Sequence, residues 1–390
     1  MAIYHLSMKP IARSSGRSAV AAAAYRAADR LENERDGLVH DFTRKAGVEH
    51  SEIVLPGDTV GSDGSTVRGS GPEWARDRSA LWNAAEGGEK RKDARVAREI
   101  EVALPHELSS SQRLALTREF SQALAKQYGV AVDFAIHSPH GQTDVRNHHA
   151  HIMMTTRKFE ETGQRIASGG ADVAGPPQKF GEKSSLELEN KKLVALGLPT
   201  SHEQLRDIRI GWEQRTNAHL AQAGFDVRID HRSHQECGLE IEPTQHVGVH
   251  ATQMERRGME VSRVRLDEEA ARRNAAVIRE KPEQVLTLIT NEKSVFDRRD
   301  IARTLHRYLD GAGSDGAAAF QSALAKVMVS PALVELQAAQ RDERGREIEP
   351  ARYSTREMVG IERQMGASAD RMEAGRGFAV APRHVDAAIG

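Results

Sequence analysis

Hydrophobic and polar residues alternate in several short segments of the first half of the chain, and this spacing predicts β-strands. In residues 97–104, Glu99 and Glu101 share one face while Ile100 and Val102 share the other. Further strands are expected at residues 3–8, 37–42, 51–55, 130–136, 148–155 and 224–230.

Helical spacing separates these strands. Ser109 is a candidate N-cap for a helix over residues 109–128, in which Leu116, Phe120 and Leu124 recur every four residues. Other helices are expected at residues 19–33, 73–86, 201–223 and 264–279. This order of elements predicts an α+β fold built on a central antiparallel sheet.

The pattern changes after Pro282. Three short helices are expected at residues 283–291, 298–309 and 317–329, followed by a hairpin of 334–338 with 347–355 and a helix over 355–372. This mainly helical region suits a winged-helix-like module, and a plain helical bundle suits it equally well.

Composition narrows the class of protein. The 390 residues favour two or three domains, and 39% hydrophobic with 28% charged residues is typical of a globular chain. Cys237 is the single cysteine, which excludes an intrachain disulfide and a thiolate-rich zinc site and leaves imidazole and carboxylate ligands. With no long apolar stretch and no signal-peptide pattern, we expect a cytoplasmic location without membrane insertion.

The net charge of −1 argues weakly against a nucleic-acid binder, but basic residues cluster locally. The candidate phosphate contacts are Arg13, Arg17, Arg26, Lys90, Arg91 and Lys92. A solvated charged surface explains each cluster about as well. Aromatic residues make up only 4% of the chain, so Trp74, Trp82 and Trp212 are the candidates for base stacking, although Trp212 lies on an apolar helix face typical of a core.

A histidine pair is the main candidate for chemistry. His149 and His151 are two residues apart in a predicted strand, so they share a face that His148 does not. His137 ends the preceding predicted strand and can complete a set of three imidazoles around a divalent cation, and His140 in the following loop is a further candidate.

Such a cation would polarise a phosphodiester. Glu99 or Glu101 would hold a histidine ring through its second nitrogen, although both also fit an ordinary stripe of strand glutamates. Tyr25, in the middle of the helix expected at 19–33, is a candidate nucleophile or a structural residue. A phenol is a weak nucleophile at neutral pH, and a nearby cation lowers its pKa.

Several of these segments resemble one known family. Residues 1–7, 13–26, 99–105 and 149–154 are similar to conjugative relaxases of the MobA/MobL type, especially the N-terminal part of TraA-like plasmid transfer proteins. Residues 227–232 and 254–258 resemble later segments of the same family, so the likeness covers about residues 1–265.

The resemblance implies a histidine-hydrophobe-histidine endonuclease fold, with helices flanking the sheet. It implies Tyr25 as the nucleophile, His137, His149 and His151 as ligands of Mg²⁺ or Mn²⁺, and Glu99 or Glu101 as the acidic partner. The implied reaction is reversible nicking of one strand at a plasmid transfer origin, with a 5′-phosphotyrosine link and a free 3′-hydroxyl. Further implied partners are a type IV secretion coupling protein and auxiliary origin-binding proteins, and the protein would enter the recipient cell attached to DNA.

We therefore expect a relaxase domain at 1–265, a helical linker at 266–281 and a small region at 282–390 that precedes a helicase in longer relatives. The chain has no Gly-x-x-x-x-Gly-Lys-Ser/Thr phosphate loop, so helicase activity is not expected. We expect the chain to be a truncated product of a longer protein. The alternatives are a rolling-circle replication initiator, a hydrolytic metalloenzyme and a non-catalytic metal-containing DNA-binding adaptor. Tyr25 precedes the histidine pair, which favours the relaxase over the replication initiator.

Overall fold

The computed structural model describes residues 4–61, 64–69, 71–139, 146–159, 180–242, 262–309, 316–342 and 347–374. The chain divides into two compact units, residues 1–231 and residues 232–390, and each is described by itself. The domain limits expected at residues 265 and 281 remain predictions. His140 and the segment 254–258 lie outside the described residues.

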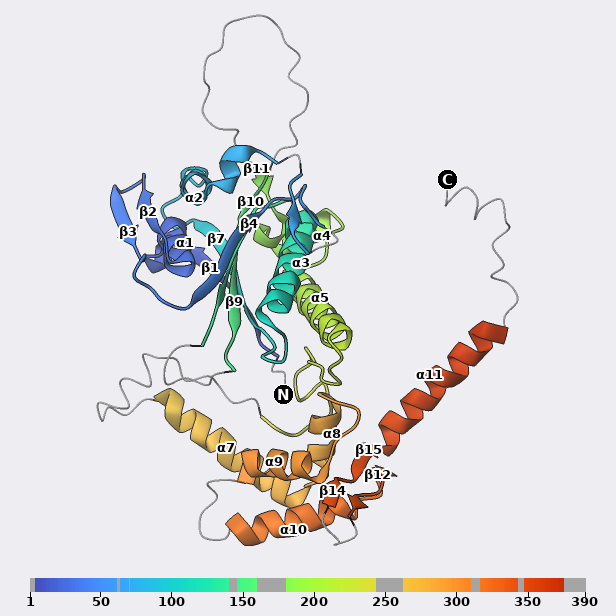
Figure 1. Ribbon diagram of the computed structural model, residues 1–390. Coiled ribbons are helices and arrows are strands. Elements are labelled where there is room, and N and C mark those ends of the chain that lie inside the picture. The colour runs from blue at the N-terminus through green and yellow to red at the C-terminus, as the bar shows by residue number, and fades with distance from the viewer. Residues whose placement is uncertain are drawn as a thin grey trace, which may run out of the picture. The chain divides into compact units, whose positions relative to one another are not determined.

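A five-stranded antiparallel sheet forms the centre of the first unit (Figure 1). Its strands, in spatial order, are β1 (Leu6–Ala12), β7 (Arg95–Ala103), β9 (His149–Thr155), β8 (Val132–His137) and β4 (Val48–Val54). The expected α+β fold with a central antiparallel sheet is confirmed. Strands distant in sequence become neighbours here. β7 pairs with β9, although a helix and β8 lie between them in the chain.

Helices flank both faces of the sheet, as expected (Figure 1). α3 (Ser110–Tyr128) and α5 (Ser201–Gln222) pack with the face that carries Ile100 and Val102. α1 (Ala19–Ala27) and α2 (Arg78–Gly87) pack with the opposite face in a second hydrophobic cluster. Strand alternation therefore supplies two separate cores, and the candidate histidines lie on the α1 and α2 face.

Ser109 caps α3 as the sequence predicts. Its hydroxyl accepts a hydrogen bond from the Gln112 backbone N–H, and the Gln112 side chain accepts one from the Ser109 backbone N–H. This reciprocal capping box satisfies two backbone donors at the helix start. Gly129 ends the helix in the left-handed conformation, with φ 68°.

The helix expected over residues 19–33 is too long. α1 ends at Ala27, because Ala28 adopts the left-handed conformation with φ 54° and its N–H bonds the Ala24 carbonyl. The following residues form a hairpin of β2 (Arg30–Asn33) with β3 (Leu38–Asp41). Alanine favours a helix as far as Ala28, but the pairing of the following hairpin ends the helix at Ala27. Tyr25 consequently lies in the last turn of α1 rather than in its middle.

Two other expectations are corrected. The helix expected at 73–86 is interrupted: a 3₁₀ turn, η2 (Glu73–Arg76), precedes α2, whose N-cap is Asp77. Residues 224–230 form no strand; instead the side chain of Asn217 in α5 hydrogen-bonds both the N–H and the carbonyl of Ile229, at 2.8 and 2.9 Å. A helix side chain thus makes the backbone hydrogen bonds that a neighbouring strand would otherwise have made.

Smaller elements complete the first unit. They are η1 (Arg13–Ser15), β5 (Thr59–Val60), β6 (Thr66–Val67), β10 (Arg157–Phe159), β11 (Phe180–Lys183), η3 (Ser185–Glu187) and α4 (Asn190–Ala195). β5 pairs with β6 and β10 pairs with β11, each pair forming a two-stranded sheet outside the central one.

The second unit is mainly helical, as expected. It contains α7 (Ser262–Glu280), α8 (Gln284–Thr290), α9 (Arg298–Leu309), α10 (Gly316–Met328), β12 (Leu333–Gln337), β13 (Gln340–Arg341), β14 (Glu347–Glu349), β15 (Arg352–Thr355) and α11 (Arg356–Ala374). The expected hairpin is present, because β12 pairs with β15 and β13 with β14. Phe296, Ile301 and Leu305 are buried in its core.

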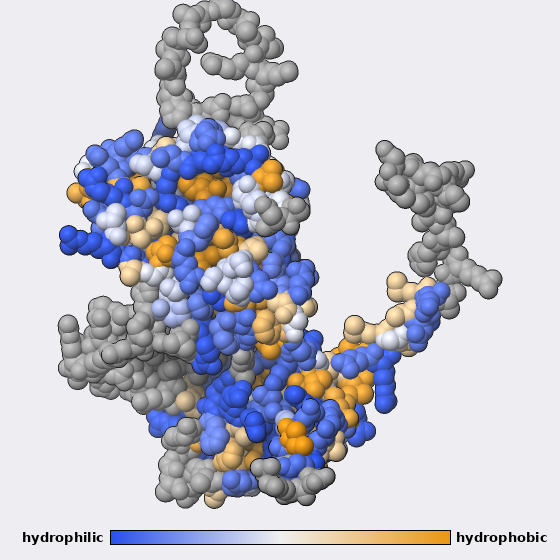
Figure 2. Space-filling view, viewed as in Figure 1, coloured by the Kyte–Doolittle hydropathy of each residue, from blue (hydrophilic) through white to orange (hydrophobic). Residues whose placement is uncertain are grey.

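The surface visible in Figure 2 is mostly hydrophilic, and its hydrophobic residues are spread in separate patches. Among the described residues, every helix is too short or too polar to cross a bilayer.

Glu52 of the edge strand β4 joins the sheet to α3. Its carboxylate accepts hydrogen bonds from Arg118 Nη2 at 2.7 Å, from His50 Nε2 at 2.8 Å and from the Thr66 hydroxyl. Burial pulls the pKa of Glu52 upward, but these hydrogen bonds outweigh it and hold that pKa at about 2.

We predict that Glu52→Gln lowers the free energy of unfolding of the first unit at neutral pH by about 2 kcal/mol. Because the folded pKa of about 2 lies below the ordinary 4.5, this stabilisation is complete above pH 4.5 and is lost as the pH falls through 2. Urea denaturation followed by tryptophan fluorescence measures it, because all three tryptophans belong to this unit. Exposed Glu182→Gln is the control, and a difference that is constant with pH would contradict the prediction.

Candidate metal centre and neighbouring tyrosine

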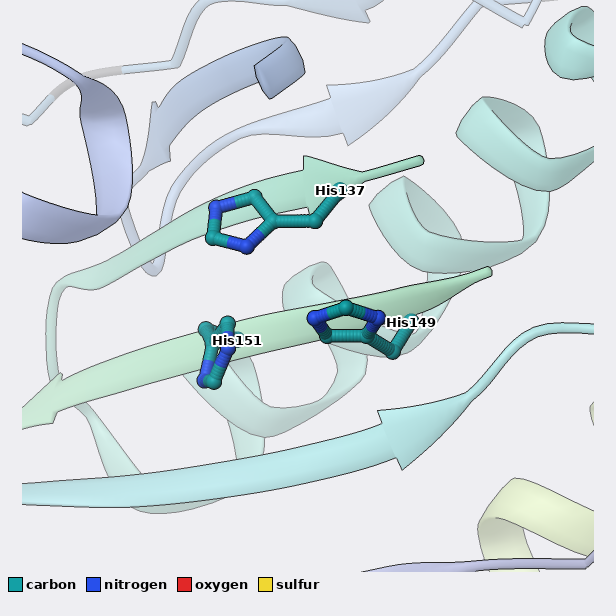
Figure 3. Close-up of side chains that lie close together, drawn as sticks. All are labelled: His137, His149 and His151. Carbon is teal, nitrogen blue, oxygen red and sulfur yellow. The ribbon is translucent and has the colours of Figure 1, made fainter. Parts of the chain in front are cut away.

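Three histidines on two adjacent strands form the candidate centre (Figure 3). His137 of β8 lies directly opposite His149 of β9, and His151 is two residues further along β9 on the same face. Their ring centroids are 4.9 to 5.3 Å apart, and one nitrogen of each ring lies within 4.8 Å of the others. The three side chains can therefore hold one metal ion.

Each ring has one nitrogen hydrogen-bonded to an acceptor. His137 Nε2 is 2.7 Å from the Arg26 carbonyl oxygen, His149 Nδ1 is 3.1 Å from the Asn147 carbonyl oxygen, and His151 Nδ1 is 2.8 Å from Glu99 Oε1. An acceptor requires a proton on the nitrogen that it contacts, which leaves the lone pair on the other nitrogen of the same ring. Each ring can therefore offer its other nitrogen to a metal ion, and its acceptor is of the kind that metal-binding histidines commonly have.

Burial favours the neutral form of the His137 and His149 rings. It lowers the pKa of His137 to about 3, and it also lowers the pKa of His149. A neutral imidazole is the form that binds a metal ion. His148, expected to be outside the set, precedes β9 and lies 3.8 Å from Glu49 instead.

Glu99 is the acidic residue that contacts a histidine of this centre. Burial raises the pKa of Glu99, but hydrogen bonds from His151 and Arg26 outweigh it and hold that pKa at about 2, so the carboxylate is charged. Glu101 lies directly opposite His151 in the strand register, yet its carboxylate is a third exposed and is 3.8 Å from Lys9. The choice between the two glutamates, open from the sequence, falls on Glu99 for this contact.

Arg26 links α1 to the centre through both its side chain and its backbone. Its Nε donates to Glu99 Oε1 at 2.5 Å, and its carbonyl oxygen accepts the hydrogen bond from His137. Since Arg26 directly follows Tyr25, the backbone that carries the candidate nucleophile is anchored to two of the three histidines.

Tyr25 is 49% exposed, so it is not a core residue. Its ring is perpendicular to the Phe42 ring, with 5.2 Å between the two centroids, and Lys45 Nζ lies over the face of the Tyr25 ring, 3.9 Å from its centroid. Lys45 was not singled out from the sequence, where it stands in a polar loop without any motif.

The candidate phosphate contacts fall into two groups. Arg13 is 6% exposed and its guanidinium binds Glu86 and nearby carbonyl oxygens, while the Arg26 side chain is 13% exposed and binds Glu99. The exposed group is Arg17, Lys90, Arg91 and Lys92, of which Arg91 pairs with Asp93. Both arginines of the first group therefore have structural partners, and contact with DNA stays a prediction for all six.

The tryptophans are poorly placed for base stacking. Trp82 and Trp212 are fully buried, so the stacking expectation is wrong for Trp82, and the core position expected for Trp212 is confirmed. Trp82 donates its indole N–H to Asp133 at 2.8 Å, and Trp212 packs against Phe120. Trp74 is partly buried beside two phenylalanines.

A second group of possible ligands consists of Glu213, Asp230 and His231. Here the Glu213 carboxylate accepts hydrogen bonds from both the backbone N–H and the ring of His231. These bonds fasten the segment after α5 to that helix, which explains the group without a metal.

We predict that Glu99→Gln weakens Mn²⁺ binding about 10- to 100-fold, because a neutral amide holds the His151 ring less firmly than a carboxylate does. Isothermal titration calorimetry measures the affinity, and circular dichroism checks the fold. Glu101→Gln is the matched control, on the same strand and face, and should bind Mn²⁺ nearly as the wild type does. Equal affinities of the two variants would refute the role of Glu99.

Comparison with known proteins gives a consistent result. The model of the MobA/MobL family matches residues 17–257. A conjugal transfer protein TraA of Rhizobium radiobacter is 37% identical over 99% of this chain and 34% of its own length, so the chain spans about a third of that relative. A mobilization protein MobL of Acidithiobacillus ferridurans is 42% identical, over 76% of this chain and 75% of its own.

A solved structure described as "Molecular Basis of Vancomycin Resistance Transfer in Staphylococcus aureus" is 26% identical, covering 60% of this chain and all of its own, with a TM-score of 0.46. The resemblance seen in the sequence is confirmed by the family match and by the two relatives: the chain belongs to the MobA/MobL family.

Proposed function

We propose that this protein is a conjugative relaxase that nicks one DNA strand at a plasmid transfer origin through Tyr25. The observation that carries the proposal is the set of three histidines, each with one nitrogen left to bind a metal, which is linked to Arg26, the residue beside Tyr25. Family membership supports it, and one relative is named a 43 kDa relaxation protein.

In the proposed step, the Tyr25 phenolate oxygen attacks the phosphorus of one phosphodiester. A bond forms between the phenolate oxygen and phosphorus, and the bond from phosphorus to the 3′ oxygen breaks. The 3′ oxygen leaves as a hydroxyl after gaining a proton, and the 5′ phosphate stays on Tyr25 as a phosphotyrosine ester. The ester conserves the energy of the broken bond, so the same 3′-hydroxyl can reverse the step without ATP.

The proposed cofactor is Mg²⁺ or Mn²⁺, held by His137, His149 and His151. When bound, such an ion withdraws charge from the non-bridging oxygens of the phosphodiester. Glu99 keeps the His151 ring in one tautomer and one orientation, and Arg26 keeps Glu99 in place. The exposed Tyr25 side chain leaves room for a DNA strand to approach.

The proposed substrate is single-stranded DNA at the transfer origin, contacted on its phosphates by Arg17, Lys90 and Lys92. Phosphate contacts position the strand without reading its sequence. The proposal places the protein in the bacterial cytoplasm and has it pass to the recipient while joined to DNA. A type IV secretion coupling protein and auxiliary origin-binding proteins are the proposed partners.

We predict a covalent protein–DNA adduct when the protein is incubated with an origin oligonucleotide and Mn²⁺ and is then run on a denaturing gel. Tyr25→Phe should abolish the adduct, because only the hydroxyl is lost. His149→Ala should abolish cleavage yet keep much of the DNA affinity, since binding depends mainly on phosphate contacts.

Other results of this gel would exclude the proposal. An adduct that persists in Tyr25→Phe would assign the nucleophile elsewhere, and cleavage without an adduct would indicate a hydrolytic enzyme. Binding without cleavage in the wild type, with a verified origin sequence, would indicate a DNA-binding adaptor.

The salt dependence of binding tests the phosphate contacts. We predict that Lys90→Ala and Lys92→Ala each reduce the slope of log affinity against log salt by about 0.7 to 1, as expected for one lost contact. Fluorescence anisotropy with a labelled single strand measures the slope. Lys191→Ala, an exposed lysine of α4 outside the predicted contacts, is the control, and an equal change there would contradict the assignment.

A further inference from the structure

We propose that Lys45 is a positioning residue for Tyr25, whose ammonium group holds the ring in place and stabilises the negative charge that develops on it. This inference rests on the proposed nicking function. It starts from two contacts that Lys45 makes with the same residue: Nζ lies 3.9 Å from the Tyr25 ring centroid and donates a hydrogen bond to the Tyr25 carbonyl oxygen at 2.8 Å. One ammonium group thereby contacts both the side chain and the backbone of the candidate nucleophile.

The loop that carries Lys45 is fastened to the end of α1. The Lys45 N–H bonds the Phe42 carbonyl at 2.8 Å, and the Phe42 N–H bonds the Asp29 carbonyl at 3.0 Å. The Phe42 ring also lies perpendicular to the Tyr25 ring, with 5.2 Å between the two ring centroids. Tyr25 is thus contacted by an aromatic ring and by a cation. Both belong to a turn that is hydrogen-bonded to the residues at the end of the tyrosine's own helix.

Ordinary ion pairing does not explain this placement. Among the described residues, no carboxylate forms an ion pair with Lys45, and the charged group that shifts its pKa is the like-charged Arg26. Burial, and then Arg26, lower the pKa of Lys45 to about 8, so the ammonium form still predominates at neutral pH. His137 and His149 also face this charge. The Lys45 ammonium group therefore lies near Arg26 and the histidines, which do not stabilise its charge. Its stabilising contacts are those with Tyr25.

The sign of the Lys45 charge matters for the proposed reaction. An ammonium group over an aromatic face attracts the neutral ring, and it attracts a phenolate more strongly. Lys45 therefore stabilises the negative charge that the Tyr25 oxygen carries as it attacks the phosphorus. We expect its loss to slow nicking about tenfold, which corresponds to about 1.4 kcal/mol of activation free energy.

The test compares Lys45→Met, which keeps the length and apolar contact of the side chain, with Lys45→Arg, which keeps the charge. In single-turnover nicking at saturating DNA, Lys45→Met should be about tenfold slower and Lys45→Arg should recover most of the rate. Arg44→Met removes the same charge from the exposed neighbouring position and should leave the rate unchanged.

A DNA-free measurement separates this inference from the proposed function. In protein with ring-labelled tyrosine, the Tyr25 resonance is the one lost in Tyr25→Phe. Lys45→Met should move it at neutral pH, and Arg44→Met should not. If the wild type fails to nick, the proposed function fails, while the resonance still reports on Lys45.

Three results would overturn the role of Lys45. The first is a Tyr25 resonance that Lys45→Met leaves in place. The second is a loss of DNA affinity with an unchanged rate at saturation, which would make Lys45 a phosphate contact. The third is an equal loss of rate in Lys45→Met and Lys45→Arg, which would show that shape rather than charge is needed.

Discussion

The pairing of β8 with β9 is the constraint on which the candidate centre depends. With His137 opposite His149, the strand repeat brings His151 to the same face, and three rings meet without any loop having to fold over them. A slip of one residue would send both histidines of β9 into the apolar core on the other face. The register is held by that core, where Ala150 and Ile152 of β9 are fully buried.

A short series of hydrogen bonds stabilises the buried negative charge beside the histidines. Glu99 is almost entirely buried and would be costly there as an unpaired anion. His151 and Arg26 supply the hydrogen bonds that keep it charged. Arg26 in turn brings the end of α1 against the sheet, so the same contacts that orient a histidine also place Tyr25. The three histidines and the proposed nucleophile are therefore joined in one network of contacts.

The surroundings of Tyr25 follow a different logic from those of the histidines. The rings of the centre are held by neutral carbonyl groups and one carboxylate, all of which favour bound positive charge. Tyr25 instead lies beside the Lys45 ammonium group and is half exposed. The end of one helix and the turn that follows its hairpin thus place a cation beside the tyrosine, whereas the histidines have hydrogen-bond acceptors beside them.

The sequence alone determined the antiparallel α+β fold, the helix capped by Ser109 and the face shared by His149 and His151, because these depend on local spacing and capping chemistry. Only the tertiary structure decided the end of α1, the choice of Glu99 for the contact with His151, and the place of Lys45. Glu99 and Glu101 have the same alternation, so their difference arises from the neighbouring strand and from Arg26, 73 residues away in the chain. Lys45 belongs to no pattern, and its role depends on a turn packing against a helix, which residue spacing does not encode.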